Sequence, residues 1–344
     1  MTTHSPDVVD VIIIGGGIIG GSIAWRMAQA GARVTLVDAG AFGGEASWAG
    51  AGMLAPGGEF VTGSSWAEFA LESLALYPGF VEELKRETGS GIDYRRCGAF
   101  EISRTEAEWQ DMLARRAAQA KLGIRSEVAG DGLFYPDDAL VDPRDVTRAL
   151  RSACEKRGVR IREQTRAMAV RVTAERADVE TSGGILSGSA AVLAAGAWSG
   201  AIPVFGPDGR IGIPATFPVR GHLLGYALEP GSLGPILRHG HTYVMQRSSG
   251  FTIAGTSSEE VGFNRELDLR IVADIRACAG ELFPRLRSAA EPMAWLGFRP
   301  ATEGFEPAIG RVGDTCLWLA YGHYRNGILL APATAARVAG EVAR

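Results

Sequence analysis

The sequence has few of the residues that build metal centres or disulfide frameworks. Its 344 residues include four cysteines and five histidines. The cysteines, at positions 97, 154, 278 and 316, are widely spaced and form no CxxC pair. This spacing is typical of reduced thiols and disfavours both a zinc centre and a disulfide-stapled fold. We expect no metal site and a cytoplasmic location.

An excess of positive charge is also missing. Lys and Arg number 35 against 39 Asp and Glu, a net charge of -4, and there is no basic tail or stripe. We therefore expect neither a nucleic acid nor an anionic lipid surface as a partner. No run of about 18 apolar residues occurs, which disfavours a membrane span. The most apolar stretch, 9–25, follows the acidic Asp7, lacks a basic leader and is interrupted by glycines, so it does not indicate a signal peptide.

The composition is that of an ordinary globular protein, with 46% hydrophobic and 22% charged residues, and the length allows two interlocked domains. The first forty residues predict one βαβ unit. An apolar, β-branched run at 8–14 indicates a strand, and small and apolar residues at helical spacing over 17–30 indicate a helix. Residues 33–37 indicate a second strand, parallel to the first. Residues 39–63 are rich in Gly, Ala and Ser without a regular period, and they predict a long loop.

Helical and extended patterns alternate through the rest of the chain. Helices are predicted at 66–87 and 143–157, the second with Asp142 as N-cap and Pro143 at its first position. Residues 218–256 alternate in a way that predicts an antiparallel sheet distinct from the first unit. The other predicted elements are strands at 159–162, 167–172, 192–195, 295–300 and 316–321, a helix at 267–283, and a final helix that begins around Asn326.

A GxGxxG motif lies at the turn between the first strand and the first helix, at Gly15, Gly17 and Gly20. Glycines in this context permit a tight turn, close approach to a pyrophosphate and close packing of strand on helix, while the helix N-terminus favours negative charge. Asp38, at the tip of the second strand, can accept hydrogen bonds from ribose hydroxyls and disfavours NADP. A glycine-rich turn without a ligand is the weaker interpretation, and the motif alone leaves FAD and NAD open.

Two arginines near the C-terminus have unusual neighbourhoods. Arg299 follows an apolar strand, and Arg325 lies between a strand and the start of a glycine-led helix. An arginine at the tip of a buried strand needs a partner or an anionic ligand, and its guanidinium matches a carboxylate through two parallel hydrogen bonds. An amino-acid substrate fits this chemistry, although a structural ion pair explains each arginine about equally well. The helix that starts at Asn326 would favour the negative charge that a flavin gains on reduction.

Four motifs carry a resemblance that extends over 11–340: VIIIGGGIIG, AGMLAP, GFRPAT and GHYRNGILLAPAT. Together they resemble the glycine oxidase and D-amino-acid oxidase family, and the last motif is most similar to glycine oxidases. The resemblance implies that Arg299 pairs with a substrate carboxylate, that Tyr243 assists there, and that Arg325 lines the same pocket. His241, two residues before Tyr243, is a further pocket candidate, with an ordinary half-buried histidine at least as probable an interpretation.

The resemblance also implies noncovalent FAD, because no cysteine neighbours Arg299 as it does in enzymes that tether their flavin. Trp48 and Phe305 depart from the family pattern and leave the exact substrate open. The residues that the resemblance assigns to FAD, together with the glycines of the turn, are Gly15, Gly17, Ile18, Ile19, Gly20, Asp38, Ala39, Ala46, Ser47, Ala51, Gly52, Met53, Ala167, His323, Tyr324, Arg325, Asn326, Gly327, Ile328 and Leu329.

The expected fold is α/β with an α+β substrate part. It comprises a Rossmann-like FAD-binding domain from 1–85, 140–215 and 297–344, and a D-amino-acid-oxidase-like second domain with an antiparallel sheet from 86–139 and 216–296. The implied activity is FAD-dependent oxidation of glycine and other small amines by a homo-oligomer that passes electrons to oxygen and supplies thiamine thiazole synthesis. The alternatives are a D-amino-acid or sarcosine oxidase or dehydrogenase, a flavin-binding protein without oxidase activity, and an NAD-dependent dehydrogenase.

Overall fold

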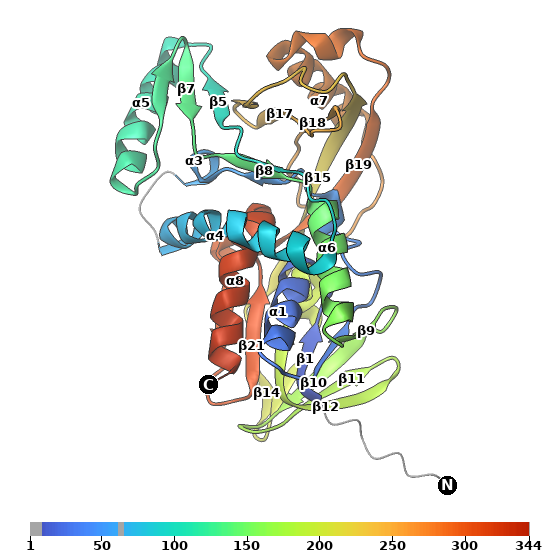
Figure 1. Cartoon of the computed structure of the whole chain (residues 1–344). Helices are drawn as coiled ribbons and strands as arrows, with labels where there is room; N and C mark the ends of the chain where they lie inside the picture. Colours follow the sequence, from blue (N-terminus) through green and yellow to red (C-terminus); the bar gives the residue numbers. More distant parts are fainter. Residues whose placement is uncertain (1–8, 61–64, 344) are drawn as a thin grey trace.

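Two large β-sheets, one above the other in Figure 1, organise the chain. The structure is a computed structural model that describes residues 9–60 and 65–343. The lower sheet has ten strands and the upper sheet eight, and a small three-stranded sheet lies between them. The architecture confirms the expected combination of a Rossmann-like unit with a second, mainly antiparallel sheet.

The βαβ unit predicted at the start of the chain is present. It consists of β1 (Val9–Ile14), α1 (Ile18–Gln29) and β2 (Val34–Val37), with β1 and β2 paired in parallel. Every residue of β2 is buried, as expected for a strand covered on both faces. Trp25 of α1 is fully buried in the same core. Strand, turn and helix therefore follow the hydrophobic pattern that the sequence displays.

The ten-stranded sheet is parallel at its centre and antiparallel at one side. β12 pairs in parallel with both β1 and β21, β2 pairs in parallel with β9, and β10, β11 and β12 form an antiparallel run. The carboxyl ends of its parallel strands thus meet at one edge of the sheet. Besides β1 and β2, its strands are β9 (Arg160–Arg162), β10 (Ala167–Val172), β11 (Ala177–Thr181), β12 (Gly184–Leu193), β13 (Val204–Gly206), β14 (Gly209–Ile211), β20 (Ala308–Arg311) and β21 (Leu317–Tyr321).

Four helices pack together beside this sheet (Figure 1). α1 contacts both α6 (Pro143–Lys156) and α8 (Gly327–Val342), and α4 (Ser65–Thr88) lies against α6 and α8. The predicted cap of α6 is confirmed, because the carboxylate of Asp142 accepts a hydrogen bond from the Arg144 N–H. The predicted final helix is also confirmed, with Asn326 as its N-cap.

Residues 39–60 contain short helices and a strand, although the sequence shows no regular hydrophobic period there and predicted a loop. This segment holds α2 (Ala46–Ala49), β3 (Met53–Leu54) and α3 (Pro56–Glu59). β3 joins β8 (Ala139–Val141) and β4 (Tyr94–Arg95) in the small sheet between the two large ones. Elements of two to four residues depend on tertiary partners, and so leave no periodic signal in the sequence. The rest of the loop predicted over 39–63 lies outside the described residues.

The antiparallel sheet predicted over 218–256 is present as the centre of the eight-stranded sheet, whose order is β19-β15-β18-β17-β16-β5-β7-β6. The predicted helix at 267–283 is α7 (Leu269–Leu282), which packs against β15, β17 and β18. The strands are β5 (Ala99–Ile102), β6 (Glu127–Ala129), β7 (Gly132–Tyr135), β15 (Thr216–Ala227), β16 (Ile236–His239), β17 (Thr242–Gln246), β18 (Phe251–Gly255) and β19 (Met293–Thr302).

Two features of the second sheet differ from expectation. The sequence analysis missed α5 (Glu106–Lys121), a charged surface helix that contributes Met112 to the core beneath it. It also predicted a strand at 295–300 and described Arg299 as lying after the apolar part of that strand. The observed strand β19 is longer, and Arg299 lies inside it and pairs across the ladder with Val219 of β15. The apolar residues that suggested a short strand form only the first part of a longer one.

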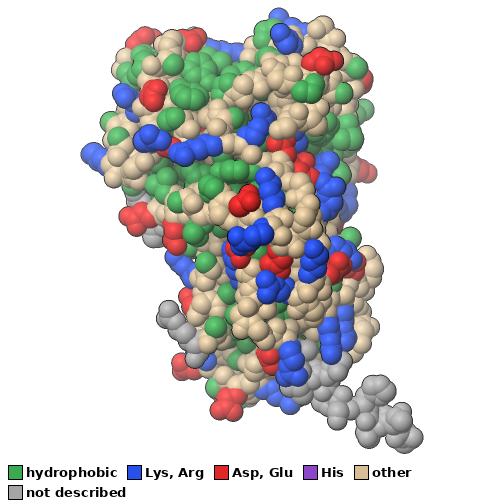
Figure 2. Space-filling model, viewed as in Figure 1, with side chains coloured by type: hydrophobic (Ala, Val, Ile, Leu, Met, Phe, Trp, Pro, Cys, Tyr) green, Lys and Arg blue, Asp and Glu red, His purple; other side chains and the backbone are tan. Residues whose placement is uncertain are grey.

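The face of the molecule shown in Figure 2 agrees with the balanced charge of the sequence. Figure 2 shows acidic and basic side chains interspersed over the face it presents, without a continuous basic stripe. Among residues 9–60 and 65–343, no helix is long and apolar enough to cross a bilayer.

The close contact between α1 and the glycine-rich turn yields a stability prediction. A Cβ atom at Gly20 would lie 1.9 Å from the Gly15 carbonyl oxygen, so α1 would have to shift away from β1. We expect Gly20→Ala to lower the free energy of unfolding by about 1–3 kcal/mol and to reduce the content of the FAD that the resemblance implies. Urea unfolding and the flavin absorbance of the purified protein measure the two effects.

Gly79→Ala is the matched control, because Gly79 lies in helix α4 and a Cβ there meets nothing within 4 Å. This control should leave stability unchanged or raise it slightly, by about 0.5–1 kcal/mol. Equal stability and equal flavin content in both variants would contradict the tight packing inferred for Gly20.

Candidate functional site

A cavity of about 700 Å³ runs between the two large sheets. At one end it is lined by residues that follow the carboxyl ends of β1, β2, β12 and β21, and at the other by residues of β15, β17 and β19. Open α/β sheets bind ligands at this edge of their strands, and the volume lies in the range of cofactor and ligand sites. The first end therefore has the position of a nucleotide site, and the second that of a substrate site.

The glycine-rich turn has the shape that a dinucleotide requires. Gly15 has φ of 111°, and a Cβ there would lie 2.3 Å from the Ala194 carbonyl oxygen. Gly17 precedes α1 and lines the cavity, whereas Gly20 faces the turn and does not line it. Ile18 and Ile19, the first residues of α1, also line the cavity, and the positive end of the helix dipole favours an anion there, so the residues present fit the pyrophosphate of FAD.

Asp38 lies at the tip of β2, where the sequence analysis expected it. Its two carboxylate oxygens accept hydrogen bonds from the backbone N–H groups of Gly16, at 2.6 Å, and Gly40, at 2.7 Å. Burial raises the pKa of this carboxyl, and the two backbone hydrogen bonds oppose that change. Asp38 thus braces the glycine-rich turn and also lines the cavity next to Ala39.

The short elements of residues 46–53 form a second wall of the cavity. The Ser47 hydroxyl accepts a hydrogen bond of 2.9 Å from the Ile18 N–H, so α2 is joined to the first turn of α1. Gly52 has φ of 95°, and a Cβ there would lie 1.9 Å from the Val141 carbonyl oxygen. This segment lies close to its neighbours because its residues are small. The predicted cofactor residues of α1, of this wall and of β10 that line the cavity are Ile18, Ile19, Ala46, Ser47, Ala51, Gly52, Met53 and Ala167.

The run from His323 to Ile328 lines the cavity at the start of α8, as expected. His323 is buried, its Nε2 lies 3.0 Å from the Thr334 hydroxyl, and burial lowers the pKa of its imidazole to about 3. The side chain is therefore neutral near pH 7. Leu329 was also expected to contact FAD, but it does not line the cavity. Its side chain is buried in the core of the lower half of the molecule.

Arg299 lines the substrate end of the cavity. Its Nη1 donates hydrogen bonds to the carbonyl oxygens of Ser257 (2.9 Å) and Arg220 (3.4 Å), and its Nη2 donates to the Thr256 hydroxyl (2.7 Å). These neutral acceptors leave the positive charge of the guanidinium uncompensated at the cavity. A Cβ at Gly221 would lie 2.4 Å from Nη1, so only glycine at this position lets the guanidinium lie flat.

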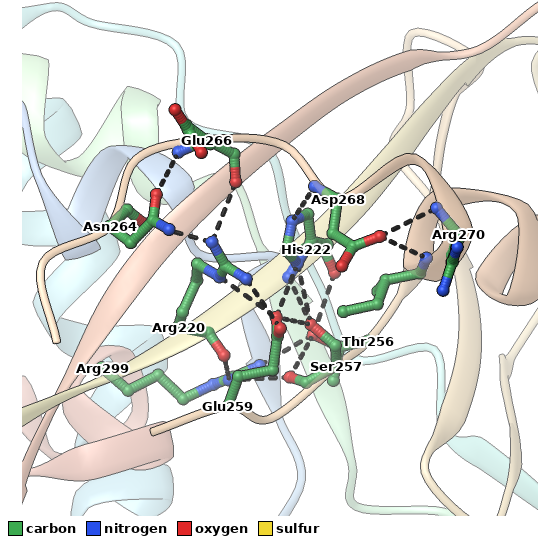
Figure 3. Close-up of polar contacts among 11 residues, drawn as sticks. Arg220, His222, Thr256, Ser257, Glu259, Asn264, Glu266, Asp268, Arg270 and Arg299 are labelled. Atoms are coloured by element: carbon green, nitrogen blue, oxygen red, sulfur yellow. Dashed lines mark hydrogen bonds and ion pairs between the residues drawn. The ribbon is translucent and has the colours of Figure 1, made fainter. Parts of the chain in front are cut away.

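Behind Arg299 lies a buried polar network, drawn in Figure 3. Arg220 forms an ion pair with Glu259 at 2.7 Å, and the Ser257 hydroxyl donates to the same carboxylate at 3.1 Å. His222 is fully buried, and its Nδ1 lies 3.0 Å from both Ser257 Oγ and Glu259 Oε2. This network holds the segment whose backbone and hydroxyl oxygens accept the hydrogen bonds of Arg299.

The tautomer of His222 follows from its partners. The backbone N–H of Asp268 donates to Nε2 at 3.1 Å, so in the neutral ring Nδ1 carries the proton and faces Glu259. Burial lowers the pKa of this imidazole, with a smaller contribution from the nearby Arg220, although Glu259 attracts the proton. Protonation of Nε2 would remove the Asp268 hydrogen bond. The neutral ring is therefore part of the frame that holds Arg299.

Tyr243 and Arg325 complete the substrate end. Tyr243 lies on β17 and is buried, and burial raises the pKa of its hydroxyl to about 12, so it stays protonated. A Cβ at Gly255 would lie 2.6 Å from the Tyr243 hydroxyl. Arg325 lies in the 3-10 turn η4 (Tyr324–Asn326) just before α8. Arg299, Tyr243 and Arg325 come from three separate parts of the chain and line one cavity.

His241 lies outside this cavity, in the turn before β17, where it is exposed. It lines a smaller neighbouring cavity of about 320 Å³ together with Arg299 and Arg325. His239, the other histidine of the HGH sequence, lies 3.4 Å from Glu108. No group of His, Cys, Asp or Glu in the described part of the chain could hold a metal ion.

Two site features escaped the sequence analysis. Glu59 lines the cavity and pairs with Arg325 at 3.0 Å. Thr256 and the network behind it hold Arg299. Glu59 follows AGMLAP by three residues, and an acid that close to a cavity motif was the available signal. The polar residues around Thr256 read as an ordinary loop because their partners lie more than 30 positions away.

Comparison with known proteins agrees with this geometry. The family model described as FAD dependent oxidoreductase (DAO) matches residues 10–341. A glycine oxidase of Bacillus licheniformis is 33% identical over 97% of this chain and 92% of its own length. A bifunctional ThiO/ThiG protein of Synechocystis sp. is 36% identical over 96% of this chain and 51% of its own length.

The crystal structure of glycine oxidase from Geobacillus kaustophilus superposes with a TM-score of 0.89 at 29% identity and covers 97% of this chain and 95% of that one. The match over nearly the whole chain excludes the NAD-dependent dehydrogenase that the glycine motif had left open. The chain belongs to the FAD-dependent oxidoreductase family. It is an enzyme, and FAD is its cofactor.

The buried imidazole of His222 makes stability depend on pH. Because its pKa is lowered in the folded protein, the unfolded chain binds more protons just below the usual histidine pKa of about 6.5. The stabilisation is therefore complete above that pH and is lost as the pH falls through the lowered value. The slope from this group is at most about 1.4 kcal/mol per pH unit.

We expect His222→Gln, which keeps a hydrogen-bonding side chain but cannot titrate, to show a shallower loss of stability between about pH 7 and pH 5. Urea unfolding midpoints of both proteins across this range provide the measurement. Parallel curves would show that His222 does not titrate on unfolding in this range.

Proposed function

We propose that this enzyme oxidises glycine and other small primary or secondary amines. The observation that carries the proposal is the position of Arg299, whose charge has no carboxylate partner among the described residues and lies at the end of a cavity shaped for a dinucleotide. A carboxylate supplies the missing negative charge through paired hydrogen bonds. The names of its relatives, glycine oxidase and ThiO/ThiG, support the same substrate class.

In this proposal the side chains of the cavity bind and orient the substrate. Arg299 holds the carboxylate, and the protonated hydroxyl of Tyr243 donates a second hydrogen bond to it. Leu223 and Gly297 line the adjacent wall and leave a small apolar space for the α-carbon. When bound, FAD supplies an acceptor for the hydride that leaves this carbon. Most of the catalytic effect then comes from position and from the exclusion of water.

No candidate base among the described residues is required to remove a proton from the α-carbon. The amine must arrive without its extra proton, because its lone pair drives the departure of the hydride. The product imine takes up water to give glyoxylate and ammonia when glycine is the substrate. The two electrons then reduce oxygen to hydrogen peroxide, and a role in thiamine thiazole synthesis follows from the resemblance to ThiO/ThiG proteins.

The same proposal includes expectations about the domain division, the electron acceptor, the location and the oligomeric state. We propose a two-domain division with the segments expected from sequence, except that the last boundary follows Thr302, because β19 belongs to the second sheet as a whole. Oxygen as the electron acceptor, a cytoplasmic location and a homo-oligomeric state remain proposals. The net charge of -4 supports the expectation that no nucleic acid is a partner.

Anaerobic flavin bleaching tests the function directly. We expect glycine and sarcosine to bleach the flavin absorbance of the purified protein, and readmitted oxygen to restore it with release of peroxide. D-Alanine and D-proline in the same panel distinguish a D-amino-acid oxidase from a glycine oxidase. If none of these amines bleached the flavin, the proposal would be wrong.

Replacement of Arg299 tests the carboxylate site. We expect Arg299→Ala to weaken the binding of glycine by about 2–4 kcal/mol, because a buried charge pair is lost. The Kd of glycolate, measured from the shift it causes in flavin absorbance, reports this change without turnover. Arg270→Ala, on the exposed surface of α7, removes the same charge and should leave the Kd unchanged. An unaltered glycolate affinity in Arg299→Ala would assign this arginine a structural role.

Covalent attachment of the flavin is not expected. The cavity is lined by no cysteine in the part of the chain that the structure describes. We expect acid precipitation to leave yellow FAD in the supernatant and a colourless protein pellet. A yellow pellet after washing would refute noncovalent binding.

A further inference from the structure

A partly exposed ion pair lies beside the substrate end of the cavity. Glu59, the last residue of α3, contacts Arg325 with Oε1 3.0 Å from Nη2. The side chains of the two residues are only 17% and 33% exposed. Both residues line the cavity that also holds Arg299 and Tyr243. The pair is therefore part of the space in which a substrate must lie.

The electrostatic environment of Glu59 is shared with the substrate site. Burial raises the pKa of its carboxyl, whereas the guanidinium groups of Arg325, Arg238 and Arg299 oppose that change. Of the other acids that line the cavity, Asp38 braces the glycine-rich turn and Glu45 pairs with Arg265. Among the described residues, Glu59 is thus the acid that faces the two arginines of the substrate end.

The charges at this end determine how many anionic groups a ligand can carry. Arg299 donates its protein hydrogen bonds to neutral oxygens, so its charge remains for a ligand. Arg325 has Glu59 as its partner. A ligand with one carboxylate therefore balances the site. A ligand with two would have to displace Glu59 and leave that carboxylate buried without its partner, which is costly.

We propose that Glu59 is a specificity-determining residue that limits the substrates to amines with a single carboxylate, by withholding Arg325 from the ligand. This inference deepens the proposed function and rests on it for the identity of the substrate carboxylate site. It predicts that a neutral side chain at position 59 turns Arg325 into a second anion-binding group.

A purely structural role is the competing explanation. The pair joins α3 to the turn before α8, and its loss could loosen both segments. A loosened site would bind every ligand more weakly. A change in specificity would instead strengthen the binding of dicarboxylates relative to that of monocarboxylates. The ratio of the two affinities therefore separates the two explanations.

The test uses the FAD-loaded protein and non-reacting carboxylates. Acetate, malonate and succinate are titrated into wild type and Glu59→Gln in mildly alkaline buffer, and each Kd is read from the shift in flavin absorbance. In Glu59→Gln, the ratio of the acetate Kd to the Kd of the tighter-binding dicarboxylate should be at least tenfold higher than in wild type. D-Aspartate should become a better substrate relative to glycine. A shift below threefold would overturn the inference.

Two further variants serve as controls. Glu68→Gln, exposed on α4, changes the net charge equally without touching the cavity and should leave every Kd as in wild type. The double variant Glu59→Gln with Arg325→Gln lacks the second guanidinium and should lose the gain in dicarboxylate binding. If it kept the gain, Arg325 would not be the second anion-binding group and the inference would be wrong.

A second measurement covers the case in which Glu59→Gln does not fold. Arg325→Gln leaves Glu59 without its partner and facing Arg299, so acetate should bind at least tenfold more weakly than to wild type. Unchanged acetate binding would overturn the inference. Failure of the proposed function looks different, because wild type would then show neither bleaching by small amines nor an acetate-dependent shift.

Discussion

The site depends on one guanidinium that is held by the protein but not neutralised by it. Arg299 lies flat over Gly221 and donates to two carbonyl oxygens and one hydroxyl, so its geometry is fixed while its charge stays available. Had a carboxylate taken the place of these oxygens, the residue would be a structural ion pair. Glycine at 221, the polar oxygens of 256 and 257, and the network of Figure 3 are each explained by this requirement.

The same constraint explains why the molecule needs two sheets. The ten-stranded sheet brings the carboxyl ends of its parallel strands and the start of α1 to one end of the cavity. The eight-stranded sheet places Arg299 and Tyr243 at the other. Residues of α2, β3 and the start of α8 line the space between them. A ligand carboxylate and a dinucleotide can therefore meet inside a cavity of about 700 Å³ whose walls come from distant parts of the chain.

The sequence predicted the elements whose signals are local. The βαβ unit, the capped helix α6 and the antiparallel strands from 218 to 256 all follow from hydrophobic period, N-cap residues and glycine position. The short elements α2, β3 and α3 were missed because two to four residues carry no period. The strand that holds Arg299 was predicted too short, at 295–300, because the polar end of β19 reads like the start of a loop. The roles of Glu59 and His222 were missed because their partners are remote in the chain.

What the sequence determined by itself is the nucleotide end of the site, since Gly15, Gly17 and Asp38 act within one continuous βαβ unit whose geometry is local. The tertiary structure alone decided which arginine is free to bind a ligand. Arg299 and Arg325 look alike along the chain, and each is explained equally well as an ion pair or as an anion site. Only the approach of Glu59 in α3 to η4 gives Arg325 a carboxylate, and only the position of residues 256 and 257 beside β19 gives Arg299 its nearest neutral oxygens. Charge pairing depends on distance in space, and distance along the chain does not report it.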